Sequence, residues 1–131
     1  MPQYPFQTVS SYAPDNLIAG LTQVVSENGT LLAGQALPRG ALLGRITASG
    51  KLTLSTATAT DGSQVPYGIL YDAYDATAGD LAGVGLYVKG EFNGNAMTFG
   101  AGQTVASVKD ALRNAGIYIK PVVTASGQYL P

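Results

Sequence analysis

Three aspartates in one short stretch are the side chains best suited to acid–base or metal chemistry. Asp72, Asp75 and Asp80 are close together in the sequence, and grouped carboxylates can transfer protons or bind Ca²⁺ through their oxygens. The segment lacks the ligand spacing and the terminal Glu of an EF-hand loop. It is also predicted to lie between two strands and not between two helices. We therefore interpret it as a solvated surface loop and assign no catalytic or metal site to it.

No other pattern of reactive residues indicates an enzyme. The chain has no Cys and no His, which excludes disulfides, thiolate metal sites, thiol nucleophiles and the usual general base. No serine lies in a G-x-S-x-G elbow, and the glycine-rich stretch at 79–85 is not followed by the G-K-[ST] of a phosphate-binding loop. The sequence therefore predicts neither catalysis nor a cofactor.

Tyrosines offer a different chemistry, because their flat rings can stack on the apolar faces of sugars. The chain has 8 tyrosines, and Tyr67, Tyr71 and Tyr74 are neighbours in sequence. They could form a carbohydrate-binding platform, or they could pack inward or at a subunit contact, where tyrosine is enriched. We favour the second interpretation and keep a carbohydrate-binding surface module as the alternative function.

The composition is that of one domain with unusually few charges. The chain has 131 residues, and charged residues make up 11% of them, where about 25% is usual. A net charge of −1 gives no electrostatic reason to expect nucleic-acid binding. No apolar run approaches the roughly 18 residues that a membrane span needs. So few charges predict that part of the surface is covered in an assembly.

Residues 1–16 differ from the rest of the chain and predict an extended N-terminal arm. Prolines interrupt a polar and aromatic stretch with no charge before Asp15, and each proline disfavours a helix. Aromatic residues are scarce in disordered segments, so we expect the arm to become ordered on the edge of a partner's sheet. The arm residues assigned to this binding are Pro2, Tyr4, Pro5, Phe6, Val9, Tyr12 and Pro14.

Residues 17–131 predict a mainly β domain of short strands and hairpins. Strands are expected at 22–25, 41–47, 51–55, 65–71, 84–92, 97–99 and 117–123. Asn28-Gly29 is expected to be the turn of a first hairpin, because both residues tolerate positive φ. Loops of small polar residues are expected at 56–64 and 72–83, and residues 124–131 resemble a loose tail.

One short helix is predicted near the C-terminus. Ser107 precedes Asp110 with the spacing of a capping box, and Gly116 stands where a left-handed cap would end the helix. Val108 and Leu112 would pack the helix on the sheet. The residues assigned to tight turns and close backbone approach are Gly34, Pro38, Gly40, Gly44, Gly68, Gly90, Phe92 and Gly116.

Several short motifs, taken in order, resemble the phage lambda-type head decoration proteins. They are GQALPRGALLGRI at 34–46, SGKL at 49–52, DG at 61–62, PYGIL at 66–70, LYVKGEF at 86–92 and ALRNAGI at 111–117. Together they extend the similarity over most of the chain, from about residue 20 to residue 123.

This resemblance implies a compact domain of β-clip type with a small helix, in a structural cement protein without enzymatic activity. It implies homotrimers on the outside of an expanded phage head, at local threefold positions and in contact with the major capsid protein. There the trimer would stabilise the head against the pressure of packaged DNA, and the N-terminal arm would reach the shell. The protein would be a late protein of the virion. The first residues lack a Sec signal, so we expect synthesis in the host cytoplasm. The alternative is a carbohydrate-binding module displayed on the virion.

Overall fold

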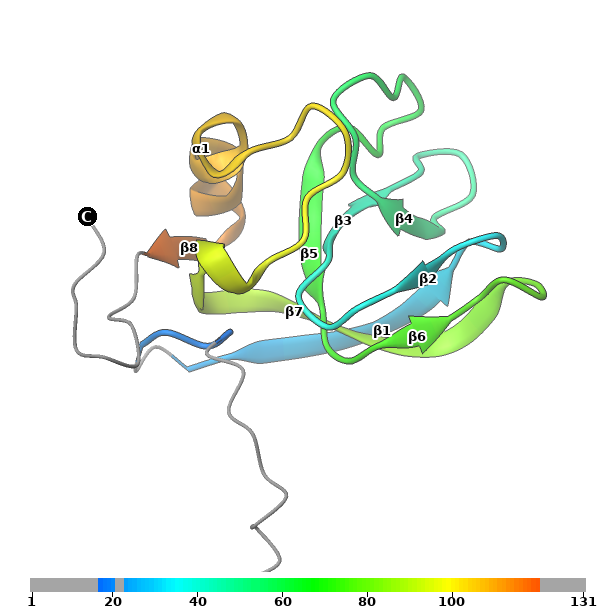
Figure 1. Ribbon diagram of the computed structural model, residues 1–131, viewed down its shortest axis with the longest axis horizontal. Helices are drawn as coiled ribbons and strands as arrows, with labels where there is room; N and C mark the ends of the chain where they lie inside the picture. The colour runs from blue at the N-terminus through cyan, green and yellow to red at the C-terminus, as the bar shows by residue number, and fades with distance from the viewer. Residues whose placement is uncertain (1–16, 21–22, 121–131) are drawn as a thin grey trace, which may run out of the picture.

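The computed structural model describes residues 17–20 and 23–120, and the interpretations of residues 1–16 and 124–131 lie outside this part (Figure 1). The domain is mainly β with one helix, as the sequence predicted. Its elements are β1 (Val25–Leu31), β2 (Ala36–Leu37), β3 (Leu42–Arg45), β4 (Leu52–Leu54), β5 (Pro66–Leu70), β6 (Tyr74–Asp75), β7 (Leu81–Asn93), the 3-10 turn η2 (Gly94–Ala96), α1 (Val105–Ala115) and β8 (Ile117–Lys120).

Five strands close into a ring. They follow one another in the order β1, β4, β3, β5 and β7, and β7 pairs back with β1. The contacts are antiparallel except between β1 and β4, which pair in parallel at Leu31 and Leu52. Closure gives the backbone groups of these strands partners on both sides. β2 and β6 form a separate two-stranded ribbon.

The long strand β7 leaves the ring at Gly90. Up to Lys89 it pairs with β1, and from Gly90 to Asn93 it pairs in parallel with β8. Gly90 has a φ of 145°, and a Cβ there would lie 2.7 Å from Val24 and 3.0 Å from the ring of Phe92. Only glycine fits this position, because a side chain would meet both a strained backbone and occupied space.

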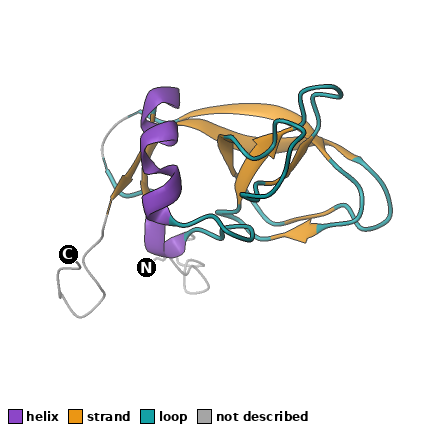
Figure 2. Cartoon of the chain, turned by 90° about the horizontal axis from the view of Figure 1, so that it is seen from above, coloured by secondary structure: helices purple, strands orange, loops and turns teal. Residues whose placement is uncertain are grey.

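The core is divided into two clusters that β7 connects. One lies beneath α1 and includes Phe92, Leu112 and Ile117. The other lies within the ring and includes Leu43 and Leu86. Figure 2 shows the helix beside the strands of the ring. Val108 and Leu112 are the buried residues of α1, as the sequence predicted, so the helix is stabilised by packing of its apolar side. No helix among the described residues is long and apolar enough to cross a membrane.

The helix begins three residues earlier than the sequence predicted. Thr104 is its N-cap, and the Thr104 and Ser107 side chains each accept a hydrogen bond from the other residue's backbone N–H, at 3.1 and 2.9 Å. Ser107 is therefore the third helical residue of a capping box and not its first member. Asp110 takes no part in the cap. Gly116 ends the helix with a φ of 96°, as expected.

Asn28-Gly29 does not form a hairpin turn. Both residues lie within β1, where Asn28 pairs with Gly85 and Gly29 pairs with Val84. A Cβ on Gly29 would lie 2.7 Å from Leu52, so glycine is present here for close packing. The local turn preference is outweighed by pairing with a strand more than fifty residues away.

Two other expectations also change: the expected loop at 72–83 contains β6 and the start of β7, and the expected strand at 97–99 is a single bridge between Ala41 and Thr98.

Candidate binding surface

The three aspartates of the candidate catalytic loop each have their own contacts, which are local for Asp72 and Asp75 and long-range for Asp80. Asp75 accepts hydrogen bonds from the Thr77 hydroxyl and backbone N–H, which lower the pKa of its carboxyl. Asp80 accepts from Lys51 Nζ at 2.6 Å and from the Ala33 N–H at 2.8 Å, and its pKa is lowered too. A general acid needs a raised pKa, so neither carboxyl suits that role.

The carboxylate of Asp72, the remaining aspartate of the loop, accepts a hydrogen bond from the Ala73 N–H at 2.8 Å. Within the part of the chain that the structure describes, no three metal-ligating side chains are grouped closely enough to hold an ion. Asp72 and Asp75 therefore stabilise local turns, and Asp80 connects the loop to Lys51 and Ala33.

The three candidate sugar-binding tyrosines are engaged in contacts within the domain. The Arg45 guanidinium lies 5.5 Å from the centre of the Tyr67 ring. Tyr71 packs against the ring of Tyr87 at 5.0 Å, and the Tyr74 hydroxyl accepts a hydrogen bond from the Gly85 N–H. Tyr71 is nevertheless 44% exposed, but no observation among the described residues favours a carbohydrate platform over these internal contacts.

Most residues assigned to turns lie at bends or close contacts. Gly44 lies in β3, where a Cβ would overlap the Ser63 carbonyl, and Gly68 lies in β5, where a Cβ would be 2.9 Å from the Tyr87 carbonyl. The Pro38 carbonyl accepts a hydrogen bond from the Ala41 N–H, whereas Phe92 is fully buried in the core. The assigned residues with positive φ are Gly34, Gly40, Gly90 and Gly116.

The described segment that follows the predicted arm adds to the edge of β7, and we call Leu17–Ala19 the entry edge. The Leu17 carbonyl accepts from the Asn93 N–H at 2.7 Å, and the Ala19 N–H donates to the Glu91 carbonyl at 2.9 Å. Ile18 lies opposite Phe92 in an antiparallel bridge. By the alternation of such bridges, its N–H and C=O point away from β7.

Ile18 is the exposed apolar residue of the entry edge. Its side chain is 41% exposed, whereas its neighbour Leu17 is 1% exposed and packs in the core beneath α1. One side chain therefore fixes the segment to the domain, while the next residue presents apolar surface and backbone groups that no described residue pairs with. This is the arrangement that accepts an added strand.

Both ends of the described chain meet at the same place. Lys120, the last residue of β8, pairs with Asn93 on one side of β7, and Leu17 bonds Asn93 on the other side. Lys120 also forms an ion pair with Glu91 at 2.6 Å. The sequence gives no local signal for this meeting, because residues 17, 93 and 120 are brought together only by the sheet.

A protein-family model described as Bacteriophage lambda head decoration protein D matches residues 7–118 of the chain. The match includes the second half of the predicted arm and the whole described domain up to the middle of β8. A search of curated proteins finds no match.

Proposed function

We propose that this chain, which belongs to the bacteriophage lambda head decoration protein D family, binds as a homotrimer to the outside of an expanded phage head. Membership of this family makes the chain a structural protein of the phage capsid and not an enzyme. Beyond that, the proposal places the trimer at local threefold positions on the major capsid protein. Its role there is to stabilise the shell against the pressure of packaged DNA, as a late protein made in the host cytoplasm.

Attachment is assigned to residues 1–16, and the observation that carries this assignment is the entry edge. The chain enters the domain as an added strand whose outer backbone groups at Ile18 face away from β7. An extended arm continuing from this edge can pair with a strand of the shell, because main-chain hydrogen bonds need no particular sequence. Tyr4, Phe6, Val9 and Tyr12 are then the anchors that fill pockets on the shell.

Three arms on one trimer would hold the protein on the head even if each arm alone binds weakly. Ordering an extended segment costs about 1–2 kcal/mol per residue, so a single arm has a large entropic cost to overcome. Once one arm is bound, the other two are held near their sites at a high effective concentration. A modest affinity per arm therefore becomes stable retention of the trimer.

Deletion of residues 2–14 tests the role of the arm. The deletion stops short of Leu17, whose side chain packs in the core. We expect the shortened protein to keep its circular dichroism spectrum and unfolding midpoint, and to lose binding to expanded, undecorated heads in co-sedimentation. Undiminished binding by the folded, shortened protein would overturn the proposal.

A matched pair of substitutions separates the anchors from general loss of apolar surface. Phe6→Ala shortens an apolar side chain of the arm, whereas Val65→Ala shortens an apolar side chain of the domain at a residue that is 56% exposed. We expect Phe6→Ala to lower head occupancy and Val65→Ala to leave it unchanged. Equal losses from the two variants would contradict the assignment of binding to the arm.

A further inference from the structure

The charged side chains of the domain are segregated, although the net charge of the chain is only −1. The side formed by α1, β8 and the end of β7 carries four cations and two carboxylates, a net charge of +2: Lys89, Lys109, Arg113, Lys120, Glu91 and Asp110. The rest of the described domain carries three cations and five carboxylates, a net charge of −2: Arg39, Arg45, Lys51, Glu27, Asp61, Asp72, Asp75 and Asp80. The side formed by α1, β8 and the end of β7 is therefore the positive side of the domain.

The positive side presents a mixed apolar and cationic surface, which we call the β8 face: Val25, Lys89 and Tyr118. Val25 and Tyr118 are 40% and 41% exposed. Val25 is the register partner of Lys89, so both side chains project from the same face of the sheet. Lys89 is exposed and forms no ion pair with a described residue, and its stem passes the C-terminal cap of α1 at Gly116.

A second surface lies outside the positive side, and we call it the Tyr71 face: Tyr71 and Asp72. Tyr71 is 44% exposed, and its ring is held against Tyr87. Its carbonyl accepts a hydrogen bond from Arg39 Nη1 at 2.7 Å. Asp72 follows directly and is exposed, and among the described residues its carboxylate accepts a hydrogen bond from the Ala73 N–H alone. An ordered aromatic ring beside a carboxylate that forms no ion pair with a described residue suits a partner surface with a cation beside apolar side chains.

We propose that the β8 face of one copy docks on the Tyr71 face of the next, with Lys89 pairing with Asp72 across the contact. This inference rests on the proposed trimer and identifies the surfaces that form it. Exposed aromatic and apolar side chains supply the buried area of such a contact, and the ion pair fixes its orientation.

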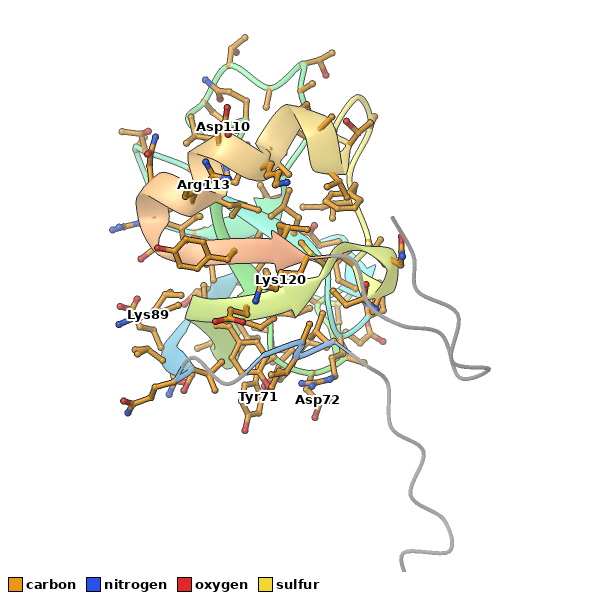
Figure 3. All side chains as sticks on the ribbon, turned by 90° about the vertical axis from the view of Figure 1, so that its left-hand side faces the viewer. Tyr71, Asp72, Lys89, Asp110, Arg113 and Lys120 are labelled. Carbon is orange, nitrogen blue, oxygen red and sulfur yellow. The ribbon has the colours of Figure 1, made fainter. Side chains whose placement is uncertain are left out.

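The relative placement of the two faces favours a closed ring. Figure 3 looks onto the side that bears Lys89, Arg113 and Lys120, and Tyr71 and Asp72 lie at its lower margin. A contact between two different faces builds a ring or an open filament, depending on whether the rotation closes. Faces on opposite sides of a molecule would extend a straight row of copies. Faces on neighbouring sides turn the row at each contact and allow it to close.

Engineered cysteines test the contact directly, because the chain has no cysteine of its own. The variant Lys89→Cys/Asp72→Cys is bound to expanded heads, oxidised, and analysed by denaturing electrophoresis without reductant. We expect covalent dimers and trimers. Monomers alone, from protein bound at the wild-type stoichiometry, would overturn the inference.

Two controls make the result specific. Lys89→Cys/Thr60→Cys carries the same number of thiols, with one on an exposed loop residue outside both faces, and should give monomers. Lys89→Cys alone should also give monomers, because a head-to-tail contact keeps equivalent residues apart. Dimers of the single variant would show a twofold contact and overturn the proposal.

The failure of this inference can be told apart from failure of the proposed function. If the wild-type protein does not sediment with heads, the proposed function fails, and the same cross-linking is performed on concentrated free protein. Cross-linked species there would support the contact, and monomers would overturn it.

Charge reversal gives a second test: Lys89→Glu should reduce retention on heads, and Lys89→Glu/Asp72→Lys should restore it. Equal retention by both variants would contradict the pairing.

Discussion

Lys51 and Asp80 join three segments that are far apart in the chain. The Asp80 carboxylate bonds Lys51 Nζ at 2.6 Å, beside β4, and the N–H of Ala33 at 2.8 Å, just after β1. The hydrogen bond from Lys51 is the main cause of its lowered pKa, and the bond from Ala33 adds to it. This aspartate, which was a candidate for chemistry, therefore has a structural role.

The pH dependence of stability tests this role. Because the pKa of Asp80 is lower in the folded protein than in the unfolded chain, its stabilising contribution is present above the ordinary aspartate pKa of about 4 and is lost as the pH falls through the folded pKa. We expect Asp80→Asn to lower the urea midpoint at pH 7. The difference in urea midpoint between Asp80→Asn and the wild type should become smaller as the pH is lowered toward 2.

A suitable control is Asp110→Asn, because the Asp110 side chain is 94% exposed and lies 4.0 Å from Arg113. Such exposed pairs contribute little, so the midpoint should hardly change. If the difference in urea midpoint between Asp80→Asn and the wild type stayed constant from pH 7 to pH 2, the structural role of Asp80 would be contradicted.

At the residue scale, composition alone excludes several kinds of chemistry, whereas the contacts of individual side chains could not be predicted from the sequence. Missing Cys and His are facts of composition, so the exclusion of much enzymatic chemistry needed no structure. The partners of Asp80 and of Tyr67 are long-range: Lys51 lies on another strand connection, and Arg45 lies on β3. Local patterns contain no information on such contacts.

At the scale of elements, predictions succeeded where a local signal agreed with the fold. Gly116 marked the end of α1 because its left-handed cap is a property of the backbone at one position. The start of α1 was misplaced because Ser107 takes the position where a capping box usually has Glu or Gln, so Thr104 was overlooked. Asn28-Gly29 was misread because β7 supplies a pairing partner that the local sequence cannot reveal.

The bend of β7 at Gly90 gives an element-scale prediction. Alanine at this position would adopt an unfavourable φ and meet Val24 and Phe92, so we expect Gly90→Ala to destabilise the domain by about 2–4 kcal/mol. Urea unfolding monitored by circular dichroism measures the change.

Gly79→Ala is the matched control for this substitution. Gly79 has no positive φ, and nothing lies within 4 Å of an added Cβ. The free energy of unfolding should therefore change by less than about 0.5 kcal/mol. Gly90→Ala and Gly79→Ala variants of equal stability would show that the bend at Gly90 does not require glycine.

At the scale of the whole molecule, topology gathers features that are scattered along the sequence. The entry edge and Lys120 meet at Asn93, so the described chain begins and ends at one place in the domain. The positive charge lies around α1 and β8, although the sequence as a whole is nearly neutral. Composition predicted an assembly from the low charge content, but the location of the two faces follows only from the fold.

The most direct test of the account is to count the copies bound to expanded, undecorated heads of the parent phage at saturation. The wild-type protein is mixed with heads in increasing amounts, and bound protein is measured by co-sedimentation and quantitative electrophoresis against the major capsid protein. We predict saturation at three copies per local threefold position. No binding to expanded heads, or saturation at a ratio incompatible with trimers at these positions, would contradict the account.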